Sequence, residues 1–201
     1  TIYRVPAIPQ NLTATAKDYS NIDLSWNKTD GAMGYQLQRS TLGADTGFYT
    51  IKTLAGVDTT TFRDTNRGLN ITYYYRVRAY IKTTSGVYYY GLTSDVASAT
   101  PFFDPIDPFT AANAGTGAIK FTWDKTEGAA GYRIYYKKSA DTDFVLMVAY
   151  APNSSIKTGI TYTKRSLKSG ESYDFYIVPY RFVNNQLAKG PISDIITLTV
   201  E

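Results

Sequence analysis

The sequence predicts an all-β protein made of two tandem β-sandwich domains. The segment 24–35, which contains Trp26, returns as the segment 121–132 around Trp123, 97 residues further along the chain. A repeat of this length matches a whole small β-domain and is too long for one unit of a solenoid. The composition agrees, because the chain has 19 Tyr and tyrosine favours pleated, half-exposed surface. No stretch has a sustained apolar period of 3.6 residues, so helices are not expected.

The first predicted domain spans residues 1–101, and its strands follow an alternation of apolar and polar residues between turn residues. In residues 21–27, Ile22, Leu24 and Trp26 share one face, because successive side chains of a strand point to opposite sides. Asp30, Gly31 and Gly34 mark the turn that follows. Seven strands are expected, at residues 11–17, 21–27, 35–40, 48–54, 60–64, 72–82 and 87–100.

The second predicted domain, residues 102–201, repeats this pattern. Ile119, Phe121 and Trp123 share one face of its second strand. Pro179 falls inside the expected sixth strand, and because proline has no amide hydrogen we expect a local break in pairing there. The strands are expected at residues 109–114, 118–124, 132–138, 144–150, 160–164, 172–183 and 192–200.

The same alternation separates a predicted core from a candidate interaction surface. The inward phase makes Trp26 and Tyr73 core residues of the first domain, and Trp123 and Tyr173 core residues of the second. In the second domain, the side chains that point outward from the sixth strand are mostly aromatic. A sheet face exposed to solvent would instead have polar side chains at these positions. This stripe is either an interface for a neighbouring domain, a second chain or a glycan, or a product of sheet propensity and cross-strand pairing. The candidate surface consists of Tyr135, Tyr176, Val178, Tyr180 and Phe182 in the second domain, and Tyr74, Arg76, Arg78 and Tyr80 in the first.

The composition argues against several function classes. The chain has no His and no Cys, which excludes nucleophile dyads built on either residue, thiolate metal sites and disulfides. No carboxylate pair has a recognisable catalytic spacing, so we expect no enzyme activity and no cofactor. The net charge of +4 is too small to indicate nucleic-acid binding. The longest apolar run, residues 145–151, is far shorter than the roughly 20 residues that cross a bilayer, so membrane insertion is not expected.

Asp104 and Asp107 are the one candidate metal site. Their carboxylates could supply oxygen ligands to Ca²⁺, but about six or more ligands are usually needed. We therefore predict that they are solvated residues between the two domains.

Both halves share a set of proline, glycine, aromatic and serine residues at matching places in the strand pattern. These are Pro9, Leu12, Trp26, Gly34, Tyr35, Tyr73, Tyr75, Arg76, Val77, Arg78, Ala79, Gly91 and Ser94, then Pro108, Trp123, Gly131, Tyr132, Leu167, Gly170, Tyr173, Gly190, Pro191, Ile192 and Ser193. With these residues the pattern resembles two tandem fibronectin type III domains over essentially the whole chain. This resemblance implies an immunoglobulin-like, seven-stranded sandwich in each half, with Tyr73 and Tyr173 as tyrosine corners whose hydroxyls bond to nearby backbone. The run at 73–80 is similar to such domains in secreted or surface proteins of Gram-positive bacteria.

From this resemblance we expect a non-catalytic extracellular module of a secreted or cell-surface protein. Its role would be spacing and adhesion, with protein or carbohydrate contact through exposed aromatics, as a monomeric or weakly self-associating part of a larger chain. The absence of an initiator Met and of a signal-peptide pattern agrees with a processed chain or a piece of a longer one.

Three alternatives remain open. The first is an accessory module of a secreted polysaccharide-degrading enzyme, against which the lack of a planar Trp platform counts. The second is a cytokine-type receptor ectodomain, against which the missing Cys and the missing Trp-Ser-x-Trp-Ser pattern argue. The third is a self-associating structural protein.

Overall fold

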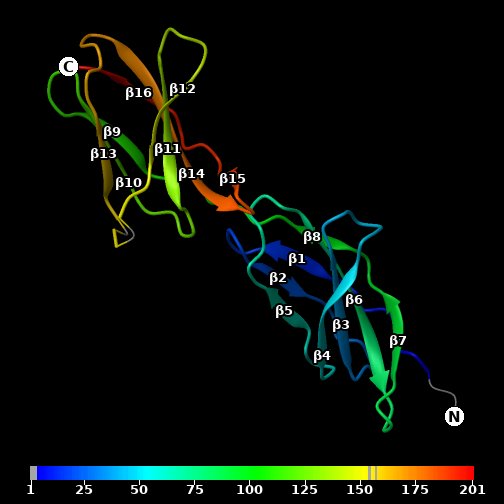
Figure 1. The fold of residues 1–201 in the computed structure, drawn as a ribbon. Coiled ribbons are helices and arrows are strands. Elements are labelled where there is room, and N and C mark those ends of the chain that lie inside the picture. The colour runs from blue at the N-terminus through cyan, green and yellow to red at the C-terminus, as the bar shows by residue number, and fades with distance from the viewer. Residues whose placement is uncertain (1–3, 154, 157) are drawn as a thin grey trace. The chain divides into compact units, whose positions relative to one another are not determined.

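The computed structural model describes residues 4–153, 155–156 and 158–201. Over these residues it contains strands β1 to β16 and no helix, which confirms the predicted all-β class (Figure 1). The chain divides into two compact units, Thr1–Phe102 (unit 1) and Phe103–Glu201 (unit 2). The sequence predicted two domains with the limits 1–101 and 102–201. That these limits bound independently folding domains stays a prediction.

Unit 1 is a sandwich of two antiparallel sheets. The smaller sheet has the order β1-β2-β5, and the larger has the order β4-β3-β6-β7. Strand β8 also pairs with β6, along the first residues of β6, whereas β7 pairs with its last residues. The predicted last strand, 87–100, is therefore two strands. The strands are β1 (Thr13–Ala16), β2 (Ile22–Ser25), β3 (Gly34–Ser40), β4 (Tyr49–Ala55), β5 (Thr61–Asp64), β6 (Tyr73–Lys82), β7 (Tyr88–Thr93) and β8 (Ala97–Ala99).

Unit 2 repeats this topology. Its sheets have the orders β9-β10-β13 and β12-β11-β14-β15, and β16 pairs β14. The short strand β15 was not expected from the sequence. The strands are β9 (Phe109–Asn113), β10 (Ile119–Trp123), β11 (Gly131–Lys138), β12 (Val145–Tyr150), β13 (Ile160–Lys164), β14 (Ser172–Val183), β15 (Gln186–Lys189) and β16 (Ile196–Thr199).

A buried serine explains why the last strand is split in both units. In unit 1 the Oγ of Ser94 accepts a hydrogen bond from the Val77 amide at 3.1 Å and donates to the Asp95 carbonyl at 2.7 Å. In unit 2 the Oγ of Ser193 does the same with the Ile177 amide and the Asp194 carbonyl, at 3.1 and 2.8 Å. The serine side chain thus replaces a strand neighbour where β7 gives way to β8, and β15 to β16.

The break expected at Pro179 is present, but proline is not its general cause. Pairing of β14 with β16 ends at Phe175, and pairing with β15 begins at Tyr180. Unit 1 has a shorter interruption at the corresponding stretch of β6: pairing with β8 ends at Tyr75, pairing with β7 begins at Arg78, and the register shifts before Tyr80, at Ala79. The feature shared by both units is the serine, so proline only occupies a position where the ladder is already open.

Replacing Ser94 with alanine is expected to lower the free energy of unfolding of unit 1 by about 1–3 kcal/mol, because the buried Val77 amide loses its partner. Ser98→Ala, an exposed position on β8, is the control and should change stability by less than about 0.5 kcal/mol. Urea unfolding of both variants measures the difference. Equal effects would contradict the role given to Ser94.

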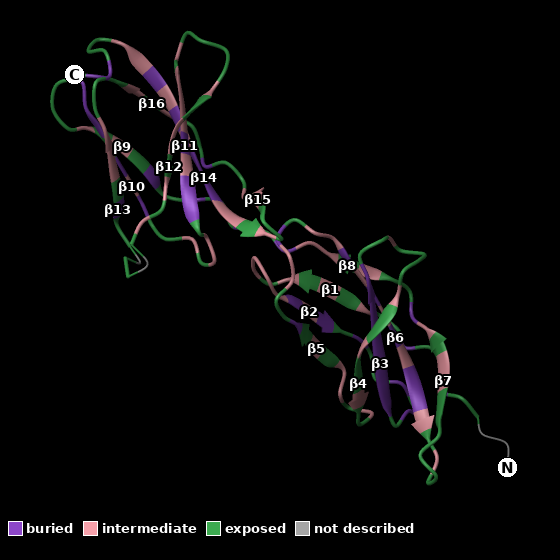
Figure 2. Ribbon diagram, viewed as in Figure 1, coloured by how far each residue is buried: buried purple, intermediate pink, exposed green. Residues whose placement is uncertain are grey.

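Each unit has its own apolar core between its two sheets (Figure 2). Trp26 and Trp123 are buried there, and each packs edge-to-face on the tyrosine that follows the glycine of β3 or β11. Those partners are Tyr35 and Tyr132, and both ring pairs have centroids 5.4 Å apart. The repeated segments therefore form the same core contact in both units.

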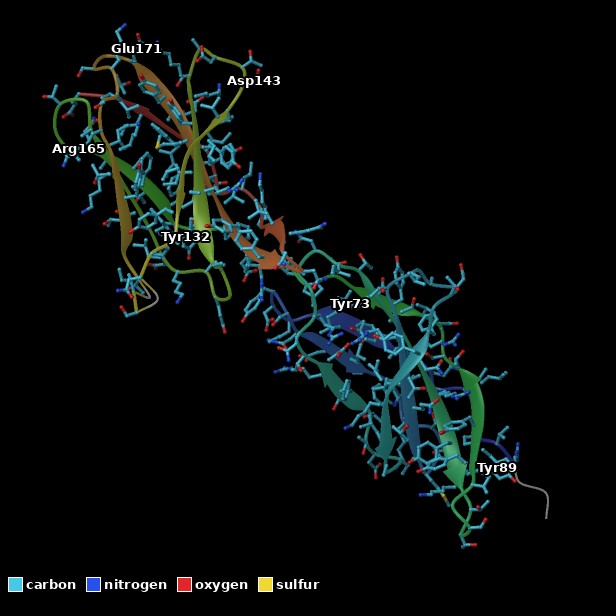
Figure 3. The ribbon with its side chains drawn as sticks, in the orientation of Figure 1. Tyr73, Tyr89, Tyr132, Asp143, Arg165 and Glu171 are labelled. Carbon is cyan, nitrogen blue, oxygen red and sulfur yellow. The ribbon has the colours of Figure 1, made fainter. Side chains whose placement is uncertain are left out.

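The two tyrosine corners are formed by Tyr73 and Tyr173. The Tyr73 hydroxyl, labelled in Figure 3, accepts a hydrogen bond from the Gly68 amide at 2.8 Å. The Tyr173 hydroxyl accepts one from the Lys168 amide at 3.4 Å. Both rings are buried, so each corner ties the loop before β6 or β14 to the core.

Candidate functional site

The outer face of the large sheet in unit 2 holds a compact aromatic group, Tyr135, Phe144 and Tyr176. Tyr135 on β11 and Tyr176 on β14 are direct cross-strand partners, and their rings stack with centroids 4.9 Å apart and planes 18° apart. The ring of Phe144, just before β12, lies 4.7 Å from that of Tyr176. We call these three residues the unit 2 aromatic group.

Two lysines border this group. The Nζ of Lys189 on β15 donates a hydrogen bond to the Tyr135 hydroxyl at 3.0 Å and lies 5.4 Å from its ring centroid. The Nζ of Lys137 lies 5.5 Å from the Phe144 ring centroid. Burial opposes ionisation of Tyr135, but the hydrogen bonds and charges of Lys189 and Arg133 together outweigh it and lower the pKa of Tyr135. Burial, together with the neighbouring Tyr135, raises the pKa of Tyr176. The group is therefore a half-buried aromatic surface with cations at its rim.

The predicted continuous stripe on β14 is wrong at Val178. Val178 is only 3% exposed and cannot belong to an open surface. Phe182, by contrast, is 60% exposed, and its ring meets that of Tyr180 edge-to-face at 6.0 Å. The predicted residues thus form two separate groups, with Tyr135 and Tyr176 in one and Tyr180 and Phe182 in the other. Sequence reasoning missed Phe144, whose place over Tyr176 depends on the turn before β12.

In unit 1 the corresponding face is a ladder of arginines and aromatic rings. The guanidinium of Arg76 lies 4.2 Å from the Phe48 ring centroid, and that of Arg78 lies 4.0 Å from the Tyr90 ring centroid. At these distances a guanidinium group is attracted electrostatically to the face of the aromatic ring. Tyr74 is half-buried on the same side of β6.

Two glutamines of β3 complete this ladder and were not expected. The Nε of Arg76 donates to the Gln38 Oε1 at 2.6 Å, and the Nε of Arg78 donates to the Gln36 Oε1 at 2.9 Å. The Gln36 Nε2 in turn donates to the Tyr90 hydroxyl at 3.1 Å. The available signal was the pair of glutamines two residues apart, which matches the two-residue spacing of the arginines across the strand pair.

Tyr80 is the second correction, because it is only 4% exposed. Its ring lies across Gly34, its partner on β3, and its hydroxyl donates to the Leu54 carbonyl on β4 at 3.2 Å. A Cβ on Gly34 would stand 2.1 Å from that carbonyl oxygen and 2.5 Å from the tyrosine hydroxyl. Gly131 makes the same close approach to the Tyr180 hydroxyl in unit 2. The glycine that opens β3 and β11 is therefore required by the tyrosine that covers it.

The candidate calcium ligands lie at the rim of a shallow pocket of unit 2. Asp104 and Asp107 line it together with Asp124, Lys125 and Glu127. Among the described residues no three acidic groups are arranged so that they could hold a metal ion. Calcium binding by the linker carboxylates thus stays untested.

Within the part of the chain that the structure describes, no helix is long and apolar enough to cross a membrane.

Comparison with known proteins identifies the fold. A two-domain fibronectin type III segment of chicken tenascin superposes with a TM-score of 0.55 at 13% sequence identity, covering 96% of this chain and 99% of that one. The FN1–FN3 domains of chicken CNTN1 superpose with a TM-score of 0.41 at 15% identity, covering 98% of this chain and 68% of that one. The tenascin match confirms the predicted fold class, two tandem fibronectin type III β-sandwiches.

Sequence comparison adds one bacterial relative. Over 74 residues the chain is 39% identical to an amylopullulanase of Thermoanaerobacterium saccharolyticum, which is 37% of this chain and 6% of that protein. The chain thus matches only a small part of a much longer relative. No family model matches the chain.

Proposed function

We propose that this chain is a non-catalytic spacer and adhesion module that links or presents other domains of a larger secreted or cell-surface protein. The observation that carries the proposal is the fold, two complete sandwiches in tandem, each with its own core. Compact units of this kind keep their shape without a partner, so they can hold neighbouring domains apart. The composition supports a non-enzymatic role, because the chain has neither His nor Cys for nucleophilic or general-base catalysis.

A spacer must unfold unit by unit when it is stretched, and this can be measured by single-molecule force spectroscopy. Pulling the chain from its two ends should give two separate unfolding events. Each should release about 30 nm of chain, the extended length of roughly 100 residues. A single event that releases the whole chain, or gradual extension without a peak, would contradict the proposal.

A second candidate is an accessory module of a polysaccharide-degrading enzyme, and the similarity to an amylopullulanase favours it. The match covers 6% of that enzyme, as expected for a small module within a long multidomain chain. In this version the exposed aromatics of unit 2 would contact the glycan, because flat rings pack well against the apolar faces of sugars.

Binding to insoluble starch tests this second candidate. Tyr176 and Phe182 are better targets than Tyr180, because the Tyr180 ring covers Gly131 and its loss would disturb the sheet. The variant Tyr176→Ser with Phe182→Ser should keep a cooperative melting transition and lose most of the binding. Leu42→Ser with Leu92→Ser, which removes two exposed apolar side chains from unit 1, is the matched control and should bind like the parent. If the parent chain stays in the supernatant, the glycan-binding candidate fails while the spacer proposal stands.

A further inference from the structure

The outer face of the large sheet in unit 1 carries three cations for which the described residues of unit 1 provide no counter-ion. Arg76, Arg78 and Lys82 stand at alternate positions of β6 and so share one side of the sheet. In the described part of the chain, the ion pairs of unit 1 join other cations: Lys28 to Asp58, Arg39 and Arg67 to Asp64, and Arg63 to Asp23. The strands of this sheet, β3, β4, β6, β7 and β8, contain no acidic residue at all.

Each of these three cations lies over an aromatic ring. Lys82 lies 4.8 Å from the Tyr88 ring centroid, which adds a third contact to those of Arg76 with Phe48 and Arg78 with Tyr90. The glutamines of β3 hold the two arginines by Nε, as described above. These contacts orient both guanidinium groups, and no carboxylate of the residues that the structure describes pairs with their terminal nitrogens. We call Arg76, Arg78 and Lys82, with the rings beneath them, the cationic face.

Unit 2 lacks this cationic face, because Tyr176 and Val178 of β14 stand in place of Arg76 and Arg78, and a lysine of the neighbouring strand has a counter-ion. Its β14 carries Asp174, whose carboxylate lies 3.1 Å from the Lys137 Nζ and accepts a hydrogen bond from the Ser139 hydroxyl at 2.6 Å. Hydrogen bonding by Ser139, together with Lys137, lowers the pKa of Asp174, so it stays ionised at neutral pH. In β6 the residue in place of Asp174 is Tyr74, which carries no carboxylate, and within the described part of the chain Arg76 and Arg78 have no ion pair.

We propose that the cationic face of unit 1 binds an acidic polysaccharide. A guanidinium group held in a plane presents paired N–H donors that match a carboxylate. Arg76 and Arg78 are about 6.7 Å apart along the strand, so they can bind successive anionic groups of one linear polymer. The hydroxyls of Tyr88 and Tyr90, which lie beside Lys82 and Arg78, supply hydrogen bonds suited to sugar hydroxyls, and favour a polysaccharide over an acidic peptide. This inference rests on the proposed function in one respect, because an extracellular chain is exposed to acidic polysaccharides.

Titration of the 201-residue chain with polygalacturonate tests the proposal. Binding should be clear at about 0.1 M salt and nearly lost at about 1 M, where charges are screened within about 3 Å. The variant Arg76→Gln with Arg78→Gln should bind at least about tenfold more weakly. The variant Arg76→Lys with Arg78→Lys keeps the charge but loses the planar donor pair. Its affinity should lie between that of the parent chain and that of the glutamine variant. Melting curves of all variants check that unit 1 remains folded.

Lys17→Gln with Arg63→Gln is the matched control. It removes the same net charge from the other side of unit 1, beside β1 and in β5, and should bind like the parent. If this control is weakened as much as the arginine variant, only net charge matters and the proposal fails. Equal binding to neutral pullulan would overturn the role of charge, and equal binding to poly-glutamate would overturn the choice of a polysaccharide. No binding to any polymer would overturn the inference but leave the spacer proposal, which rests on unfolding under force.

Discussion

Replacing Asp64 with asparagine is expected to destabilise unit 1 by about 3–5 kcal/mol, because it leaves the buried Arg39 without a counter-ion. The Asp64 Oδ2 accepts hydrogen bonds from the Arg39 Nη1 at 2.7 Å and from the Tyr75 hydroxyl at 2.8 Å. Arg67 approaches the same carboxylate at 3.4 Å. Burial works against the charge of Arg39, but the hydrogen bonds and charges of Asp64 and Tyr49 together outweigh it and raise the pKa of Arg39. Arginine keeps its proton in proteins, so Arg39 cannot escape the loss of Asp64 by becoming neutral.

Asp58→Asn is the control, because Asp58 pairs with Lys28 at an exposed site and the loss should be about 1 kcal/mol or less. Chemical unfolding measures the free energy of unfolding of both variants. A third variant combines Asp64→Asn with Arg39→Tyr, because Tyr136 of unit 2 stands in place of Arg39. This double replacement should cost less than Asp64→Asn alone, since it removes the buried guanidinium together with its counter-ion. If the single variant is no worse than the control, Asp64 does not stabilise Arg39.

Replacing Trp123 with alanine is expected to destabilise unit 2 by about 3–5 kcal/mol. The indole is buried between the two sheets, and its ring meets those of Phe109, Tyr132 and Tyr150 edge-to-face. Three aromatic neighbours on separate segments cannot close around alanine without leaving a cavity. Since small domains have a total stability of about 5–15 kcal/mol, unit 2 should melt far below its usual temperature.

The same variant tests whether the two units fold independently. Trp26 is then the only tryptophan, so its fluorescence reports unit 1 alone. We expect the fluorescence transition of Trp26 to stay where it is in the parent, while far-ultraviolet circular dichroism shows an earlier transition for unit 2. A matching shift of both transitions would contradict the prediction of two independent domains.

The sequence predicted most of the fold because its main signals are local. Alternation along single strands was enough to place Trp26, Trp123, Tyr73 and Tyr173 in the cores. The split of the last strand was not predicted, because it depends on where the side chain of Ser94 or Ser193 meets another strand.

The candidate surface was harder to predict, for the same reason. Alternation tells which side of a sheet a side chain leaves, but not what lies above it, and Val178 proved to be buried. Tyr80 is covered because it pairs with Gly34, a residue 46 positions away in the chain. The partners of Arg76 and Arg78 likewise come from other strands. Such contacts follow from the register between strands, which a single strand's pattern does not contain.

The difference between the two cores also bears on how the chain avoids assembling wrongly. Tandem repeats of similar sequence are prone to exchange strands during folding. If β13 of unit 2 took the place of β5 in unit 1, Lys164 would stand where Asp64 stands and would meet Arg39 and Arg67 at close range. Like charges this close repel one another, so this hybrid sandwich is penalised electrostatically despite the shared tryptophan motif.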